Sequence, residues 1–101
     1  MIEKYVMDIH FFKKNISPKL TNYTLKYSSY PNGDFGDLER VEVQGENKIG
    51  GIDFWSQGWI DIDIYDLTLD EQLINVLLDP NEMEAQEKAI YKFLKILLDE
   101  K

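Results

Sequence analysis

The stretch from Gly51 to Tyr65 (GIDFWSQGWIDIDIY) alternates apolar and polar side chains almost without error. Because successive side chains of a strand point to opposite sides of a sheet, this pattern predicts a β-hairpin with one apolar face. The apolar face consists of Ile52, Phe54, Ile60, Ile62 and Ile64. The opposite face carries Asp53, Trp55, Trp59, Asp61, Asp63 and Tyr65.

The loop of this hairpin decides which residues lie opposite each other. A two-residue loop, Gln57-Gly58, would set Phe54 opposite Asp61 and mix the two faces along the whole strand. A three-residue loop over residues 56–58, with Gly58 in the left-handed conformation, keeps both faces pure. We therefore expect the three-residue loop. It pairs Trp55 with Trp59, Phe54 with Ile60 and Asp53 with Asp61.

The polar face of the hairpin has the character of a binding surface. Two carboxylates opposite each other, Asp53 and Asp61, destabilise an isolated sheet, and large aromatic side chains beside water are typical of interfaces. The chain has a net charge of −8, which favours and steers a cationic partner. We predict that a basic protein docks on this face, through Asp53, Trp55, Trp59, Asp61, Asp63 and Tyr65.

Two structural alternatives remain open for the same face. In the first alternative, the acidic residues are only the solvated side of an amphipathic sheet, and Arg40 and Lys26 on neighbouring strands partly neutralise them. In the second alternative, the N-terminal helix covers the face, buries the tryptophans and leaves the aspartates at the rim.

Composition excludes several classes of protein. A length of 101 residues predicts one domain over residues 1–101, and 44% hydrophobic residues are enough for a folded core. The acidic balance argues against direct binding of nucleic acids or anionic membranes. The absence of cysteine excludes disulfides and thiolate catalysis. No secretory signal or apolar run of about 20 residues is present, so a cytoplasmic location is expected.

Hydrophobic spacing predicts the remaining elements. We expect a helix over residues 2–15 that ends at Ser17-Pro18, with a strand over 4–12 as the alternative. Strands are expected over 20–30 and 38–44, with a turn at 31–34. Residues 72–78 fit either a strand or a short helix. A last helix is expected, with Asp79 as its cap, Pro80 at its first position and Glu82 in capping-box spacing.

Together these elements predict an α+β fold. An antiparallel meander of four or five strands is packed with N-terminal and C-terminal helices, in two layers. If both helices cover the Ile52 side of the hairpin, the acidic and aromatic side is left to solvent or to a partner.

Residues for catalysis are scarce. The one histidine, His10, reads as a packed or surface residue, and no nucleophile–base set is present. Gly50-Gly51 lacks the spacing of a phosphate loop and indicates a bulge or a tight approach beneath Tyr65 or Trp55. A small metal-dependent hydrolase would use Asp53, Asp61 and Asp63, but such sites need a pocket, and a flat sheet offers little concavity. We expect no enzymatic activity, metal or cofactor.

The hairpin segments 51–55 and 58–65, followed by Leu73–Leu78 and a lysine-studded helix to Leu98, resemble small immunity proteins of bacterial contact-dependent growth inhibition and related polymorphic toxin systems. The resemblance implies a cytoplasmic protein that neutralises a cognate toxin domain, frequently a basic RNase or DNase, by stoichiometric binding. An acidic adaptor domain unrelated to toxins is the alternative. The oligomeric state is left open.

Overall fold

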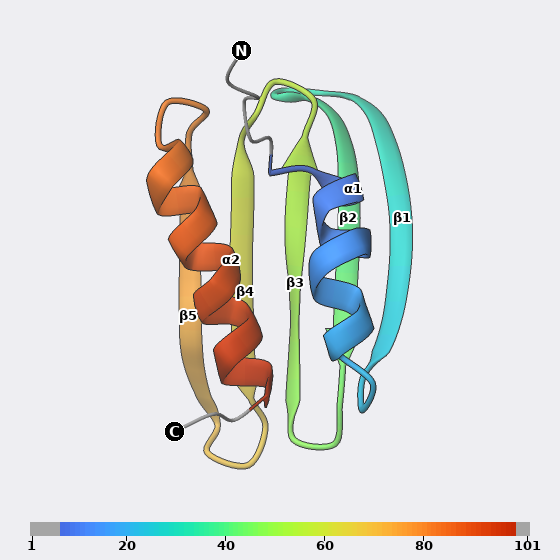
Figure 1. The fold of residues 1–101 in the computed structure, drawn as a ribbon, viewed down its shortest axis with the longest axis vertical. Coiled ribbons are helices and arrows are strands. Elements are labelled where there is room, and N and C mark those ends of the chain that lie inside the picture. The colour runs from blue at the N-terminus through green and yellow to red at the C-terminus, as the bar shows by residue number, and fades with distance from the viewer. Residues whose placement is uncertain (1–6, 99–101) are drawn as a thin grey trace.

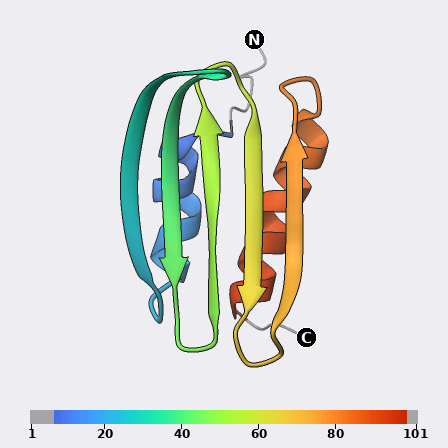
Figure 2. The ribbon, with the colours of Figure 1, turned by 180° about the vertical axis from the view of Figure 1, so that it is seen from behind.

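The computed structural model describes residues 7–98. Its elements in chain order are α1 (Ile9–Phe11), η1 (Phe12–Ile16), η2 (Ser17–Lys19), β1 (Thr24–Gly33), β2 (Gly36–Gln44), β3 (Lys48–Trp55), β4 (Ile60–Asp66), β5 (Glu71–Leu78) and α2 (Met83–Leu98). The strands form one five-stranded antiparallel sheet in the order β1-β2-β3-β4-β5. The helices lie on one side of the sheet (Figure 1), and the opposite side is open in Figure 2. The predicted α+β meander packed with two helical segments is confirmed.

The hairpin has the expected register. Phe54 lies opposite Ile60, and Asp53 lies opposite Asp61. The Trp55 N–H donates to the carbonyl of Trp59 at 3.0 Å, and the Gly58 N–H donates to the carbonyl of Trp55 at 2.8 Å. Gly58 has φ +99°, which a side chain would disfavour. The three-residue loop is therefore confirmed.

Residues 72–78, which fit two structures by sequence, belong to β5. This strand pairs with β4, and the ladder is irregular where Ile64 lies opposite Ile74 and Tyr65 lies opposite Gln72. Leu73 is thus an extra residue, as in a β-bulge. Pairing with β4 decides in favour of a strand, and such a long-range contact has no local sequence signal.

The N-terminal segment is helical from residue 9 to residue 19. Asp8 caps it by accepting the Phe11 N–H at 3.0 Å. The strand alternative is therefore wrong for residues 9–12, and residues 2–6 of the predicted helix lie outside the described residues. Pro18 does not end the helical segment, because it occupies the first turn of η2, where no N–H is needed.

The turn between β1 and β2 is shorter than expected. Strand β1 continues through the predicted turn at 31–34 to Gly33, and the turn consists of Asp34 and Phe35. The pairing is irregular between Tyr30 and Gly33. Pro31 is tolerated there because β1 is an edge strand.

Helix α2 begins later than its capping signals suggest. The Asp79 carboxylate accepts the Asn81 N–H at 2.8 Å and forms a turn of its own, so its assignment as the helix cap is wrong. The helix starts at Met83, and the carbonyl of Glu82 accepts the first helical N–H, from Gln86, at 2.8 Å. The Gln86 side chain donates to the carbonyls of Asp79 and Gly58, both at 2.9 Å, and so fixes the helix start against the β3–β4 loop.

The core lies between the helices and the apolar side of the sheet. The hairpin residues predicted to face inward are all buried there. Their buried partners from the helical segments include Phe11, Phe12, Ile16, Ile90, Phe93 and Leu97. Phe12 contacts the rings of Tyr27 on β1 and Phe54 on β3. The Tyr23 hydroxyl donates to the carbonyl of Leu97 at 2.5 Å and ties the end of α2 to the start of the sheet.

Candidate protein-binding face

We call the side of the sheet opposite the helices the open face (Figure 2). The register and ring contacts place on it all six residues predicted to bind a partner: Asp53, Trp55, Trp59, Asp61, Asp63 and Tyr65. Trp55 and Trp59 lie at the end of the β3–β4 hairpin, the three aspartates lie in the middle, and Tyr65 lies at the other end. The alternative in which the N-terminal helix buries the tryptophans is wrong, because that helix lies on the other side.

Three aspartates and one arginine, Arg40, lie at the centre of the open face, and the arginine forms an ion pair with only one of them. Arg40 forms a two-point ion pair with Asp53, at 2.8 Å from Nε to Oδ1 and 3.2 Å from its second nitrogen to Oδ2. This hydrogen-bonded pair raises the pKa of Arg40. Lys26, which was expected to help neutralise the face, forms no ion pair with any described residue. Asp61 and Asp63 are therefore not compensated by ion pairs in the described part of the chain.

The environment of Asp61 and Asp63 disfavours their charged forms. Partial burial raises the pKa of Asp61, and the neighbouring charge of Asp53 raises it further. Partial burial likewise raises the pKa of Asp63, together with the charges of Asp61 and Asp53. Arg40 lowers both pKa values, but the net shift is upward. A cation supplied by a partner would relieve this repulsion.

The raised pKa values predict how Asp61 affects stability. An acid whose pKa is higher in the folded than in the unfolded protein lowers the free energy of unfolding as pH rises through and above its unfolded pKa. Asp61→Asn should therefore raise that free energy near pH 7, by up to about 1 kcal/mol for a like-charge cross-strand contact. The gain should shrink in acid, as measured by urea unfolding across pH. Glu46→Gln, at an exposed loop position, is the matched control, and an Asp61→Asn variant less stable than wild type at pH 7 would contradict the account.

An aromatic cluster stands beside the acidic centre. Phe35, from the β1–β2 turn, stacks on Trp59 with ring centroids 4.4 Å apart and lies edge-on to Trp55 at 5.4 Å. The two tryptophans are half-buried, so part of each ring is accessible. Sequence reasoning missed Phe35; an aromatic residue within a Pro-Asn-Gly-Asp-Phe-Gly turn is the signal that points to it.

Backbone contacts between two loops hold Phe35 in place. The Ser56 N–H donates to the carbonyl of Asp37 at 2.8 Å, and the Gln57 N–H donates to the carbonyl of Phe35 at 3.2 Å. In return, the Asp37 N–H donates to the Ser56 hydroxyl at 2.9 Å. The aromatic cluster is therefore built on two tied hairpin ends and is preorganised for binding.

The open face is not flat, contrary to the expectation from sequence. A shallow hollow of about 410 Å³ lies next to the acidic residues. It forms where Gly51, between Glu42 and Asp63 in the register, contributes no side chain. A Cβ on Gly51 would lie 2.7 Å from the carbonyl oxygen of Val41, so the neighbouring strands pass close to it. The register runs unbroken through β3, so Gly50-Gly51 does not form a bulge. The predicted tight approach at this position is confirmed, but the atoms that come close belong to the backbone of neighbouring strands and not to Tyr65 or Trp55.

Tyr65 lies apart from the tryptophans. Its hydroxyl donates to Asp70 in the β4–β5 turn, and this hydrogen bond raises the pKa of Tyr65. It lines the hollow together with Ile49, Asp53 and Asp63. The open face therefore combines an aromatic end, an acidic centre and a hollow bounded by Tyr65.

The one histidine of the chain lies in the helical layer, away from the open face. His10 is exposed, on the first helical turn. Within residues 7–98, no group of three or more histidine, aspartate or glutamate side chains is arranged to hold a metal ion. Over the same residues, no helix has the length and apolar character to cross a bilayer.

Comparisons with known proteins give no information about the function of the open face. No protein-family model matches the chain, and searches of curated proteins and of solved structures find no significant match.

Proposed function

We propose that this chain is a binding module that holds a basic protein on its open face. In keeping with its resemblance to immunity proteins, we propose further that the partner is a toxin nuclease, which the chain neutralises by stoichiometric binding in the bacterial cytoplasm. Nucleases bind phosphate through basic surfaces, and an acidic face that covers such a surface excludes the substrate.

The observation that carries the proposal is the shortage of positive charge on the open face. Asp53 is paired with Arg40, while Asp61 and Asp63 have raised pKa values and no ion pair among the described residues. A lysine or arginine of the partner that enters the hollow beside Asp63 would supply the missing charge. Contact with a cation in a partly desolvated hollow is worth more than the same contact in water.

The aromatic cluster supplies the apolar part of the interface. Trp55, Trp59 and Phe35 offer large, half-buried rings next to the acids, and tryptophans are frequent anchors of binding energy. Arginine stacks on such rings while its guanidinium contacts carboxylates, so an arginine-rich partner fits both parts of the face.

The first test is co-expression of the chain with the open reading frame directly upstream of its gene. We expect a one-to-one complex that survives purification, whose association slows as salt rises because charge steers the encounter. In the nuclease case, the purified upstream protein should cleave RNA or DNA, and one equivalent of this chain should stop it. A complex without any nuclease or other toxic activity of the partner would favour the adaptor function, and no complex would contradict the toxin pairing.

A further inference from the structure

The two edges of the sheet are protected to different degrees. Edge strands expose unpaired N–H and C=O groups, and lysine, proline or irregular pairing prevents unwanted association there. Strand β1 has all three features: exposed Lys26, Pro31 and the irregularity after Tyr30. Strand β5 has its one charge, Glu71, and its irregularity, at Leu73, near its start. From Ile74 to Leu78 it has no charge, proline or irregular pairing, and no described strand pairs with this part of its outer edge.

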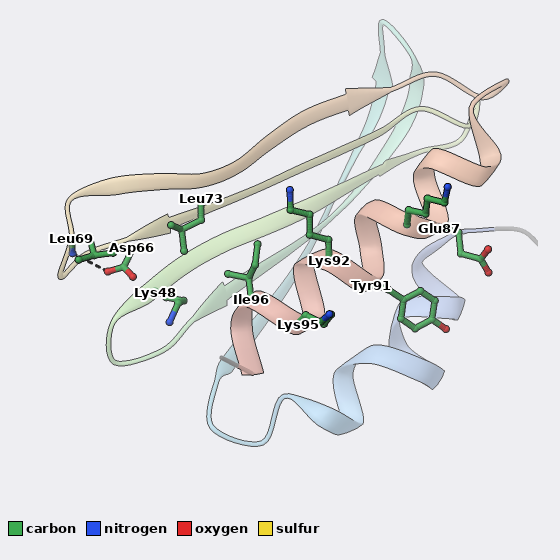
Figure 3. A pocket seen from close by; sticks show the side chains of 10 residues that line it. Lys48, Asp66, Leu69, Leu73, Glu87, Tyr91, Lys92, Lys95 and Ile96 are labelled. Carbon is green, nitrogen blue, oxygen red and sulfur yellow. Dashed lines mark hydrogen bonds between the residues drawn. The ribbon is translucent and has the colours of Figure 1, made fainter. Parts of the chain in front are cut away.

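Exposed leucines and a groove accompany the unprotected edge. Leu67, Leu69 and Leu77 are 50%, 63% and 51% exposed, and all belong to β5 or the turn before it. A groove of about 740 Å³ lies nearby (Figure 3), with apolar lining from Leu69, Leu73 and Ile96. Lys48, Lys92 and Lys95 also line it, and none of them forms an ion pair with a described residue.

We propose that β5 pairs antiparallel with β5 of a second copy of this chain, so that two sheets join into one. A two-fold axis at Val76 places Ile74 opposite Leu78 and Asn75 opposite Leu77 in the regular part of the strand. Residues opposite each other then share a side of the joined sheet, as β-pairing requires. In this register no charged residue of the strand lies opposite a like charge.

The second copy also fits the charges of α2. This helix covers β4 and β5 (Figure 1), so the two copies of α2 run antiparallel on either side of the axis. Helix α2 crosses the sheet obliquely, from β5 at its start towards β4 at its end, so its first half lies nearest the axis (Figures 1 and 2). Side chains from the two helices therefore meet.

The rise per residue gives the alignment of these helices. Val76 lies three residues, about 10 Å, before Asp79 along the strand. Helix α2 runs back along the strand from Glu82, and the same length of helix contains about six or seven residues. Lys88 is therefore at about the level of Val76. An axis at the level of Lys88 sets Glu84 of one copy opposite Lys92 of the other, on both sides of the dimer. Lys88 itself forms an ion pair with Glu84 of its own chain at 3.5 Å, which offsets its approach to the other Lys88.

The joined sheet places the two open faces side by side on the same side of the dimer, away from the helices. Binding of a basic partner through the open face and dimerisation through β5 use different residues, so either one stands or fails without the other.

Sedimentation velocity from about 10 to 300 µM tests the dimer, a range that covers the affinities expected of a modest interface. The wild type should show a monomer–dimer equilibrium. Leu77→Lys, at an exposed edge position, and Lys92→Glu, opposite Glu84, should each weaken it at least about tenfold. Circular dichroism checks that both variants remain folded.

The controls separate this interface from any other. Lys26→Glu makes the same change of charge as Lys92→Glu but lies at the opposite edge of the sheet, so it should leave the dimer intact. The triple variant Glu84→Lys, Lys88→Glu and Lys92→Glu reverses all three charges, so it restores opposite charges across the axis and keeps opposite charges at positions 84 and 88 within each chain. It should recover the dimer. A wild type that is monomeric throughout the range would overturn the proposal, as would a dimer that Leu77→Lys does not weaken or one that Lys26→Glu weakens just as strongly. A triple variant that dimerises as weakly as Lys92→Glu would overturn the alignment of the helices.

Discussion

Asp61→Lys should weaken binding of the basic partner at least about a hundredfold, corresponding to about 3 kcal/mol. The substitution removes a carboxylate of the open face that forms no ion pair with a described residue, and it places a positive charge where the partner's own cation would lie. It also sets a lysine opposite Asp53, which competes with Arg40 for that carboxylate. Isothermal titration calorimetry with the purified partner measures the loss.

Two matched variants keep this prediction specific. Glu87→Lys makes the same change of charge on α2, on the other layer of the molecule, and should cost less than about fivefold, as expected for long-range charge alone. Trp59→Ala should weaken binding by about 2 kcal/mol or more, whereas Tyr91→Ala, an exposed aromatic residue on α2, should not. Asp61→Lys and Trp59→Ala variants that both bind like the wild type would exclude the open face as the binding surface.

Phe12→Ala should lower the free energy of unfolding by about 3–5 kcal/mol. Phe12 has no exposed surface, and its ring contacts Tyr27 on one edge of the sheet and Phe54 on the hairpin. Its removal leaves a cavity between the N-terminal helical segment and the sheet. Because a domain of this size has only about 5–15 kcal/mol in total, the variant should unfold at a much lower urea concentration.

A surface aromatic residue provides the comparison. Tyr91 is 40% exposed and touches Phe11 only edge-on, with ring centroids 6.3 Å apart. Tyr91→Ala should therefore cost about 1 kcal/mol or less. Equal costs for the two substitutions would show that the N-terminal helical segment is not part of the core.

The hairpin was predictable because its information is local. Alternation over residues 51–65 identifies both faces, and only the loop ending in Gly58 keeps them pure, so even the pair of Asp53 and Asp61 follows from the sequence. Strand β5 and the start of α2 were less accessible. Pairing with β4 decides the first, and the turn that Asp79 forms with Asn81 delays the second.

The composition of the binding face was only partly predictable, for the same reason. Alternation places the six predicted residues on one face, but Phe35 reaches the tryptophans through hydrogen bonds between two loops that are distant in sequence. The hollow depends on Gly51 lying between Glu42 and Asp63 of two other strands. The compensation of Asp53 by Arg40, and the absence of such an ion pair for Asp61 among the described residues, likewise depend on side-chain geometry.

The chain contains two tryptophans, and both lie on the open face, so they report directly on its occupancy. With 5-fluorotryptophan incorporated into this chain alone, ¹⁹F NMR gives separate signals for Trp55 and Trp59 during titration with the partner. Both signals should shift and stop changing at one partner per chain, whereas Asp61→Lys should need more partner to reach the same shift. A saturated complex in which both signals keep their free positions would show that the partner binds elsewhere.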